Sequence, residues 1–316
     1  MTPRSITCLV LAAACWTALV GGGAFAQTHA KAKAKTPAPA ATQAQASPCD
    51  ILADDPQDPF RSAPGVDAHL IDAAKAVPAC KAAVEAAPED GRLRYAYSRA
   101  LQRAGDEAGA GDAIQRAAER RYPIAEDIVG MLYLKAGQPD VAAQLIRRSA
   151  DHGYLPAQMT LGAFYHQGVG VPQDAKQAVE WYRKAADAGY PLAQVALGGL
   201  YHRGDGLPQD DAQALALYHK AAAANYAGGQ GGIGDAYYNG WGVKKDEKQA
   251  LAWYQKAGDQ GYPPALAALG VMYHNGEGGL KPDDAKAAAY LKQAAELGFA
   301  PAQPLLAALH QGAAGK

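Results

Sequence analysis

The chain has 316 residues and carries 30 basic against 31 acidic side chains, a net charge of -1. A chain so evenly charged has no positive field to gather phosphates, which argues against nucleic acid as a partner. Its length would suffice for two ordinary domains, but short internal repeats point to one extended architecture instead.

The first 26 residues have the pattern of a cleavable secretory signal, with Arg4 before an apolar run over residues 6–20. The small residues Ala24 and Ala26 flank Phe25 and predict cleavage after Ala26. The apolar run is 15 residues long, fewer than the roughly 20 that a membrane-spanning helix needs, so an uncleaved anchor is a less favoured alternative. Lipid attachment at Cys15 is another. We expect the mature chain to be periplasmic or secreted and not to span the membrane.

Residues 27–48 form a tract rich in alanine, proline and lysine, and we expect a disordered linker because large apolar side chains are too few to bury. The next segment, residues 49–88, is expected to be an N-terminal cap. It holds the two cysteines that remain after signal cleavage, Cys49 and Cys80. In an oxidising compartment this pair predicts one disulfide, with two buried free thiols as the alternative.

Residues 89–155 predict two short helix pairs, because Gly105 and Gly137 each end a helical pattern and stand 32 residues apart. Both pairs lack the longer connection found in the repeats that follow. We therefore interpret them as two degenerate repeats.

Residues 156–299 predict four units with a 36-residue step. In the first unit Leu161 and Tyr165 lie at helical spacing before Gly168, which predicts helix A. Asp174 then caps helix B, which Gly189 ends. The step is shown by recurring Leu-Gly or Ile-Gly pairs, by recurring tyrosines and by paired glycines: Leu161-Gly162, Leu197-Gly198, Ile233-Gly234 and Leu269-Gly270; Tyr165, Tyr201, Tyr237 and Tyr273; Gly168 and Gly170, Gly204 and Gly206, Gly240 and Gly242, Gly276 and Gly278. Residues 300–316 begin a further helix A without a helix B, which suits a C-terminal capping helix and tail.

The first unit reads Ala-x-x-x-Leu-Gly-x-x-Tyr-x-x-Gly-x-Gly-Val-x-x-Asp and then Ala-x-x-Trp-Tyr-x-Lys-Ala-Ala-x-x-Gly. This pattern resembles the Sel-like repeat family of the tetratricopeptide-repeat superfamily. Later units depart mildly, with Leu217 in place of the tryptophan, Asn225 in place of the last glycine and one extra residue after Gly278. The resemblance implies an all-α, right-handed α/α superhelical solenoid of helix-turn-helix repeats. It also implies a scaffold or adaptor role through protein–protein contacts.

Residues 49–93 are similar to the cap regions that precede such repeats in bacterial envelope proteins, which implies a Gram-negative source. Some cysteine-rich relatives are linked to β-lactam binding, but they carry a cysteine pair in each repeat and this chain carries none there. The favoured function is therefore an envelope scaffold that is not an enzyme. An envelope enzyme, or a binder of a β-lactam or cell-wall fragment, is the alternative.

Two patterns that could signal a bound group are interpreted structurally. Residues 229–234 fit Gly-x-Gly-x-x-Gly, but they fall inside a predicted helix A and follow no strand, so we expect a locally loosened helix and no cofactor. His166, His202 and His274 share one repeat position, which Tyr238 takes in the third unit. Stacked repeats keep such positions on the order of 10 Å apart, too far for one metal ion, so no metal is expected.

The same position predicts a partner-binding groove, because helix A lines the concave face in this superfamily. A half-exposed polar column beside buried tyrosines is the alternative. The groove residues are expected to be His166, Gln167, His202, Arg203, Asp235, Tyr238, Asn239, His274 and Asn275. A shallow polar trough of this kind suits an extended protein or peptide partner.

Overall fold

The computed structural model describes residues 46–314, with side chains described up to residue 310. This part of the chain contains 15 α-helices, two short 3-10 helices and no strand. The prediction of an all-α solenoid of helix-turn-helix repeats is confirmed. None of the helices in this part is long and apolar enough to cross a bilayer. The predicted signal and most of the predicted linker lie outside the described residues.

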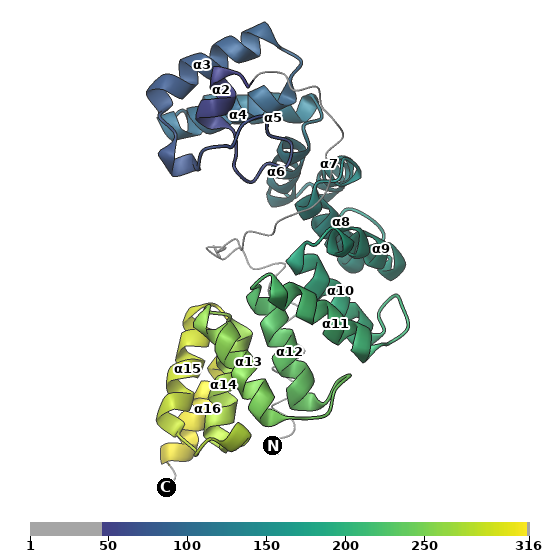
Figure 1. Cartoon of the computed structure of the whole chain (residues 1–316), viewed down its shortest axis with the longest axis vertical. Helices are drawn as coiled ribbons and strands as arrows, with labels where there is room; N and C mark the ends of the chain where they lie inside the picture. Colours follow the sequence, from purple (N-terminus) through teal and green to yellow (C-terminus); the bar gives the residue numbers. More distant parts are fainter. Residues whose placement is uncertain (1–45, 315–316) are drawn as a thin grey trace. The chain divides into compact units, whose positions relative to one another are not determined.

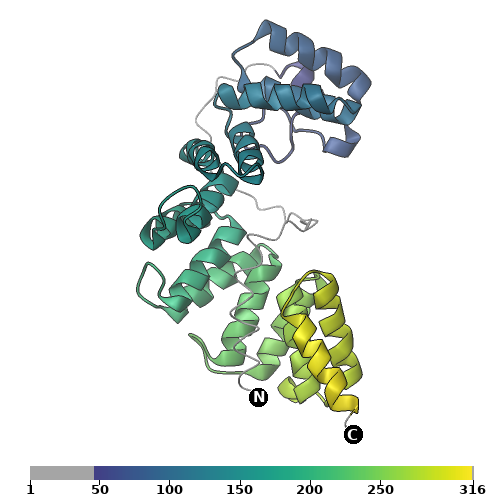
Figure 2. The same ribbon diagram turned by 180° about the vertical axis from the view of Figure 1, so that it is seen from behind.

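The chain divides into two compact units, and residues 46–174 are the described part of the first. Each helix packs on the next, and α2 contacts both α3 and α4. Figures 1 and 2 show α3, α4 and α5 side by side. The helices of this unit are α2 (Pro48–Ala53), η1 (Ala68–Leu70), α3 (Ala73–Ala86), α4 (Gly91–Ala104), α5 (Glu107–Glu119), α6 (Pro123–Lys135), α7 (Pro139–Asp151) and α8 (Leu155–Gln167).

The second unit comprises residues 175–314 of the described chain. Helices α10, α12 and α14 are the A helices of their repeats and contact one another in order, while α11, α13 and α15 are the B helices. Its helices are α9 (Ala175–Asp187), α10 (Pro191–Arg203), α11 (Asp211–Ala223), α12 (Ala227–Asn239), α13 (Glu247–Asp259), α14 (Pro263–Asn275), η2 (Glu277–Gly279), α15 (Asp284–Glu296) and α16 (Ala302–Ala314).

The paired glycines have two separate physical roles. The first glycine ends helix A in the left-handed region, as at Gly240, where φ is 80°. The second glycine lets the loop touch the preceding helix B. A Cβ on Gly206 would lie 2.5 Å from the carbonyl oxygen of Ala175, and one on Gly242 would lie 2.5 Å from that of Asp211. Each loop therefore locks one repeat onto its neighbour, and no larger residue fits there.

An aspartate links helix A to helix B in each repeat of the second unit. The Asp210 carboxylate caps α11 by accepting from the backbone N–H of Gln213 at 2.9 Å. Its own N–H donates to the carbonyl of Tyr201 at 2.9 Å. Asp246 and Asp283 do the same for α13 and α15. The recurring tyrosine and the recurring aspartate are thus two ends of one turn.

The glycine-rich start of α12 is tightly packed. A Cβ on Gly229 would lie 2.7 Å from the backbone nitrogen of Ala222, and one on Gly232 would lie 2.8 Å from the Tyr218 ring. A Cβ on Gly234 would lie 2.6 Å from the Tyr254 ring. The expected loosening of this helix is not what the contacts show, because neighbouring rings and backbone fill the space that side chains would need.

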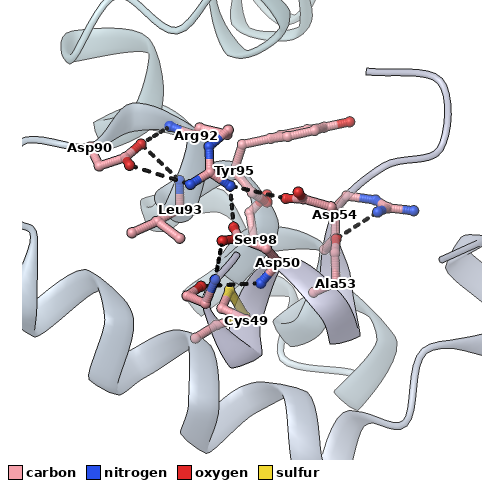
Figure 3. Close-up of a disulfide and its surroundings, with 12 residues drawn as sticks. Cys49, Asp50, Ala53, Asp54, Asp90, Arg92, Leu93, Tyr95 and Ser98 are labelled. Carbon is pink, nitrogen blue, oxygen red and sulfur yellow. Dashed lines mark hydrogen bonds and ion pairs between the residues drawn. A yellow bond between two sulfur atoms is a disulfide. The ribbon is translucent and has the colours of Figure 1, made fainter. Parts of the chain in front are cut away.

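The cap of the first unit combines a disulfide with buried charges (Figure 3). Cys49 and Cys80 are bonded and fully buried, so the disulfide joins α2 to α3. Beside it, the Arg92 guanidinium lies among three carboxylates (Figure 3). It forms ion pairs with Asp50, with Asp54 at 3.3 Å and with Asp90 at 3.5 Å. Burial raises the pKa of Asp54, and the nearby Arg92 charge partly offsets that shift.

The loop after α2 is held to the helices beneath it. The Arg99 guanidinium donates to the carbonyls of Ala53 at 2.6 Å and Val66 at 2.9 Å. The Tyr95 hydroxyl donates to Asp55 at 2.8 Å. The Asp54 carboxylate accepts from the backbone of the same loop, at residues 62 and 63. Polar contacts therefore fix this loop in place, and these contacts cannot be predicted from the sequence of the loop alone.

Candidate functional site

The predicted groove residues lie at or near the C-terminal ends of the A helices. His166 and Gln167 end α8 in the first unit. The other seven lie on the neighbouring helices α10, α12 and α14 of the second unit. We call these seven residues the A edge: His202, Arg203, Asp235, Tyr238, Asn239, His274 and Asn275.

Two histidines of the A edge contact helix B of their own repeat. Nδ1 of His202 lies 2.7 Å from Oδ1 of Asp211, the first residue of α11. Nδ1 of His274 lies 2.6 Å from Oδ1 of Asp284, the first residue of α15. The two pairs differ in exposure, because the His202 and Asp211 side chains are 25% and 28% exposed but those of His274 and Asp284 are 53% and 50% exposed.

The same repeat position also contacts the loop of the next repeat. The His202 ring lies on the ring of Trp241, with centroids 3.8 Å apart and planes inclined by 31°. The Tyr238 hydroxyl donates to Oε2 of Glu277 at 2.9 Å. Trp241 and Glu277 are the middle residues of their Gly-x-Gly loops. These side chains therefore join successive repeats along the A edge.

Asp235 is the acidic residue of the A edge and is partly buried. Its carboxylate accepts a hydrogen bond from the Tyr254 hydroxyl at 2.7 Å. Burial raises the pKa of Asp235 to about 7, although the Tyr254 hydrogen bond acts in the opposite direction. This carboxyl group therefore changes charge near neutral pH.

Two of the residues that follow the column positions, Arg203 and Asn275, are exposed. Arg203 is exposed and makes no hydrogen bond or ion pair within the described chain. Asn275 is exposed and donates to Oε1 of Glu277 at 3.1 Å, while Asn239 donates to the carbonyl of Asp235 at 2.9 Å. These amide and guanidinium groups can bind peptide carbonyls and carboxylates.

The sequence did not indicate the partners of the column: Asp211, Trp241, Glu277 and Asp284. Two signals were available, an acid nine residues after His202 and ten residues after His274, and a variable residue between the paired glycines. Among the described residues, no three His, Cys, Asp or Glu side chains cluster as metal ligands would. The arrangement provides donors and acceptors on a rigid helical edge.

The fold and this edge define an α/α-repeat protein. Residues 155–190, 191–226, 229–262 and 263–299 each match the family model described as Sel1 repeat. The chain therefore contains four Sel1 repeats, as the resemblance implied.

Solved structures of other repeat proteins are similar to the chain, including the following two. One is a Sel1 repeat protein from Oxalobacter formigenes, with 29% identity and a TM-score of 0.60 over 67% of this chain and 86% of that chain. The other is c5321, a protective antigen of uropathogenic Escherichia coli with an SLR fold, with 30% identity and a TM-score of 0.61 over 75% of this chain and 52% of that chain. No curated protein matches the chain. Sel1 and tetratricopeptide-like repeat proteins generally act as protein-interaction scaffolds.

Proposed function

We propose that the protein is an interaction scaffold of a bacterial envelope and that its A edge binds a partner protein or peptide. The observation that carries this proposal is the combination of fixed and free side chains on three adjacent helices. His202 and Tyr238 hold the edge rigid through Trp241 and Glu277, while Arg203 stands exposed beside them without a partner in the described chain. Rigid helical presentation of polar groups suits specific binding.

An envelope location is supported by the buried disulfide between Cys49 and Cys80, because such bonds persist in oxidising compartments. It is also supported by the signal-like pattern of the first 26 residues. The intact mass of the exported protein tests both points. The expected mass corresponds to cleavage after Ala26 with one disulfide and no free thiol, and a retained leader would contradict the proposal.

Partner binding is tested by a charge-matched pair of variants. Arg203→Glu with Asn275→Glu changes the A edge, whereas Lys220→Glu with Gln255→Glu makes the same charge change at exposed positions of the B helices. Proteins that co-purify with the tagged chain from solubilised envelopes are quantified by mass spectrometry. We expect a specific partner to fall at least 10-fold with the A-edge variant and to be retained with the other. Equal retention, or equal loss, would contradict binding at the A edge.

A further inference from the structure

The first unit contains a cavity of about 610 Å³ that the A edge does not include. It lies between the loop after α2, residues 67 and 68, and the helices α4, α5 and α6. All of its lining residues belong to the first unit. Its volume is within the range of cavities that hold a few side chains or a small ligand.

Part of the lining of this cavity is apolar, and we call its three large aliphatic residues, Ile114, Ile128 and Leu132, the floor. Ile128 is 36% exposed and Leu132 is 52% exposed, which makes them two of the few large apolar side chains that the described chain leaves open to solvent. Covering them with another apolar group would be favourable by roughly 25 cal/mol per Å² buried.

The charged lining residues are mostly acidic. We call them the rim, and they are Asp55, Asp67, Glu107 and one cation, Arg99. The Arg99 guanidinium already has partners within the chain. It donates to two backbone carbonyls and lies 3.8 Å from Asp55. Asp67 and Glu107 are exposed, and neither side chain has an ion pair or hydrogen bond within the described residues. The carboxylates of Asp67 and Glu107 can therefore form ion pairs with a cationic partner.

The position of this rim depends on the cap. The Tyr95 hydroxyl fixes Asp55, and Arg99 holds both ends of the loop that carries it. The disulfide then joins α2, which precedes this loop, to α3, which follows it. Figure 3 shows Cys49, Ala53, Asp54 and Tyr95 within this one cluster. The cavity is thus formed by the cap and the first helix pairs together.

We infer that this cavity is a second docking site, separate from the A edge, for a partner segment in which a leucine, isoleucine or phenylalanine is flanked by lysine or arginine. The apolar floor takes the bulky side chain, and the free carboxylates of Asp67 and Glu107 take the cations. The chain's own lysines at 31, 33 and 35 do not meet both requirements. Residues 27–45 contain no leucine, isoleucine, valine or aromatic ring other than His29 to fill the floor.

The probe is a fluorescein-labelled peptide, Gly-Lys-Leu-Phe-Lys-Gly, titrated with the full mature chain and followed by fluorescence anisotropy. Two matched peptides accompany it, Gly-Glu-Leu-Phe-Glu-Gly and Gly-Lys-Ala-Ala-Lys-Gly. We expect saturable binding of the first peptide, weakened at least 10-fold in either matched peptide and weakened by salt. Absence of saturable binding up to about 1 mM, or equal binding of all three, overturns the inference.

Three variants locate the binding. Glu107→Lys is expected to weaken the basic peptide about 5- to 10-fold and to strengthen the acidic one, because one rim charge is reversed. Leu132→Ser is expected to weaken both by removing part of the floor, and its 52% exposure predicts little change in folding. Glu85→Lys makes the same charge change at an exposed position of α3 outside the cavity and is expected to change neither. Equal effects of Glu107→Lys and Glu85→Lys would overturn the inference.

A further variant replaces Lys31, Lys33 and Lys35 with alanine. We expect its affinity for the basic peptide to equal that of the unaltered chain. A marked gain in affinity would show that the chain's own lysines occupy the cavity, which would overturn the assignment to a partner. Binding that survives these variants and fails only in Arg203→Glu would place the peptide at the A edge, which would overturn this inference and leave the proposed function standing.

Discussion

In the cap, Arg92 lies among three carboxylates and a disulfide joins two helices, whereas in the second unit glycines, alanines and tyrosines bring the helices together. The cap contains the short helices α2 and η1, and the core around its disulfide is built largely from small side chains such as Ala53, Ala76 and Ala96. The repeats bury alanine and branched aliphatic side chains in their helix pairs, as at Ala214, Leu217, Ala221 and Ile233. Small segments without a large core need covalent or ionic support.

Because the cap relies on buried charges and the repeats rely on close packing, the two regions respond differently to substitution. A buried charge cluster tolerates no missing partner, because an unpaired buried charge is costly. A packed repeat tolerates no added atom, because backbone lies where a Cβ would be. The cap is therefore sensitive to removal of groups and the repeats to their addition.

Removing the central charge of the cap is expected to have the largest effect. Arg92→Ala leaves the buried carboxylates of Asp50 and Asp54 without their cation, and we expect the free energy of unfolding of the first unit to fall by about 3 to 5 kcal/mol. Urea denaturation followed by circular dichroism measures it. Arg103→Ala on the exposed face of α4 is the control. An equal loss of stability in both variants would contradict a stabilising role for the ion pairs of Arg92.

Loss of the disulfide is expected to rank next. Cys49→Ser with Cys80→Ser opens a link between residues 31 positions apart, and the chain-entropy model gives a loss of about 3 to 4 kcal/mol. Hydrogen exchange should then rise in residues 48–86 and stay unchanged in residues 175–314. Thiol labelling of the denatured, unreduced protein provides the companion test. Stoichiometric labelling of both cysteines would contradict the bond itself.

Adding one methyl group tests the repeats. Gly242→Ala places a Cβ 2.5 Å from the Asp211 carbonyl at a φ of 64°. We expect the free energy of unfolding to fall by about 2 to 3 kcal/mol. Gly261→Ala has a similar φ of 74° but nothing within 4 Å, so only the backbone strain of about 1 kcal/mol applies. Thermal unfolding of both variants measures the difference. Equal melting temperatures of the two variants would contradict a close contact between the loop of Gly242 and helix α11.

Asp235 provides a pH-dependent test. Its pKa rises from 3.8 to about 7 on folding, so the fold favours the protonated carboxyl group, and this contribution is lost as the pH rises through 7. Asp235→Asn keeps an acceptor for Tyr254 without the charge. Allowing for partial exposure, we expect its stability advantage over the unaltered chain to grow by about 1 to 2 kcal/mol between pH 5 and pH 8. An advantage that is independent of pH would contradict the burial of this charge.

The histidine pair gives the smallest expected effect. His202→Ala removes a hydrogen bond with Asp211 and a ring contact with Trp241. We expect the free energy of unfolding to fall by about 1 kcal/mol. His274→Ala breaks a similar bond between side chains that are half exposed, and we expect less than about 0.5 kcal/mol. Differential scanning calorimetry compares the two. A larger loss at His274 would contradict the role assigned to Trp241.

The sequence predicted the repeats well because their signals are local. Glycine at a left-handed position and aspartate before a helix act within a few residues, so Gly240 and Asp246 mark their turns directly. Contacts between repeats were not predicted, because Trp241 lies 39 residues from His202 in the sequence and its ring is specified only by packing. The cap was predicted least well. Its central ion pair joins Asp50 to Arg92, and only the cysteines hinted that these segments meet.

We propose that the chain acts by holding a partner along the A edge. A photo-crosslinking amino acid placed at Arg203 or at Asn275 in living cells tests it most directly, with Lys220 and Gln255 on the B helices as matched positions. We expect a discrete protein adduct of the same mass from Arg203 and Asn275 and none from Lys220 and Gln255. Adducts only from Lys220 and Gln255, or the same adducts from all four positions, would contradict it.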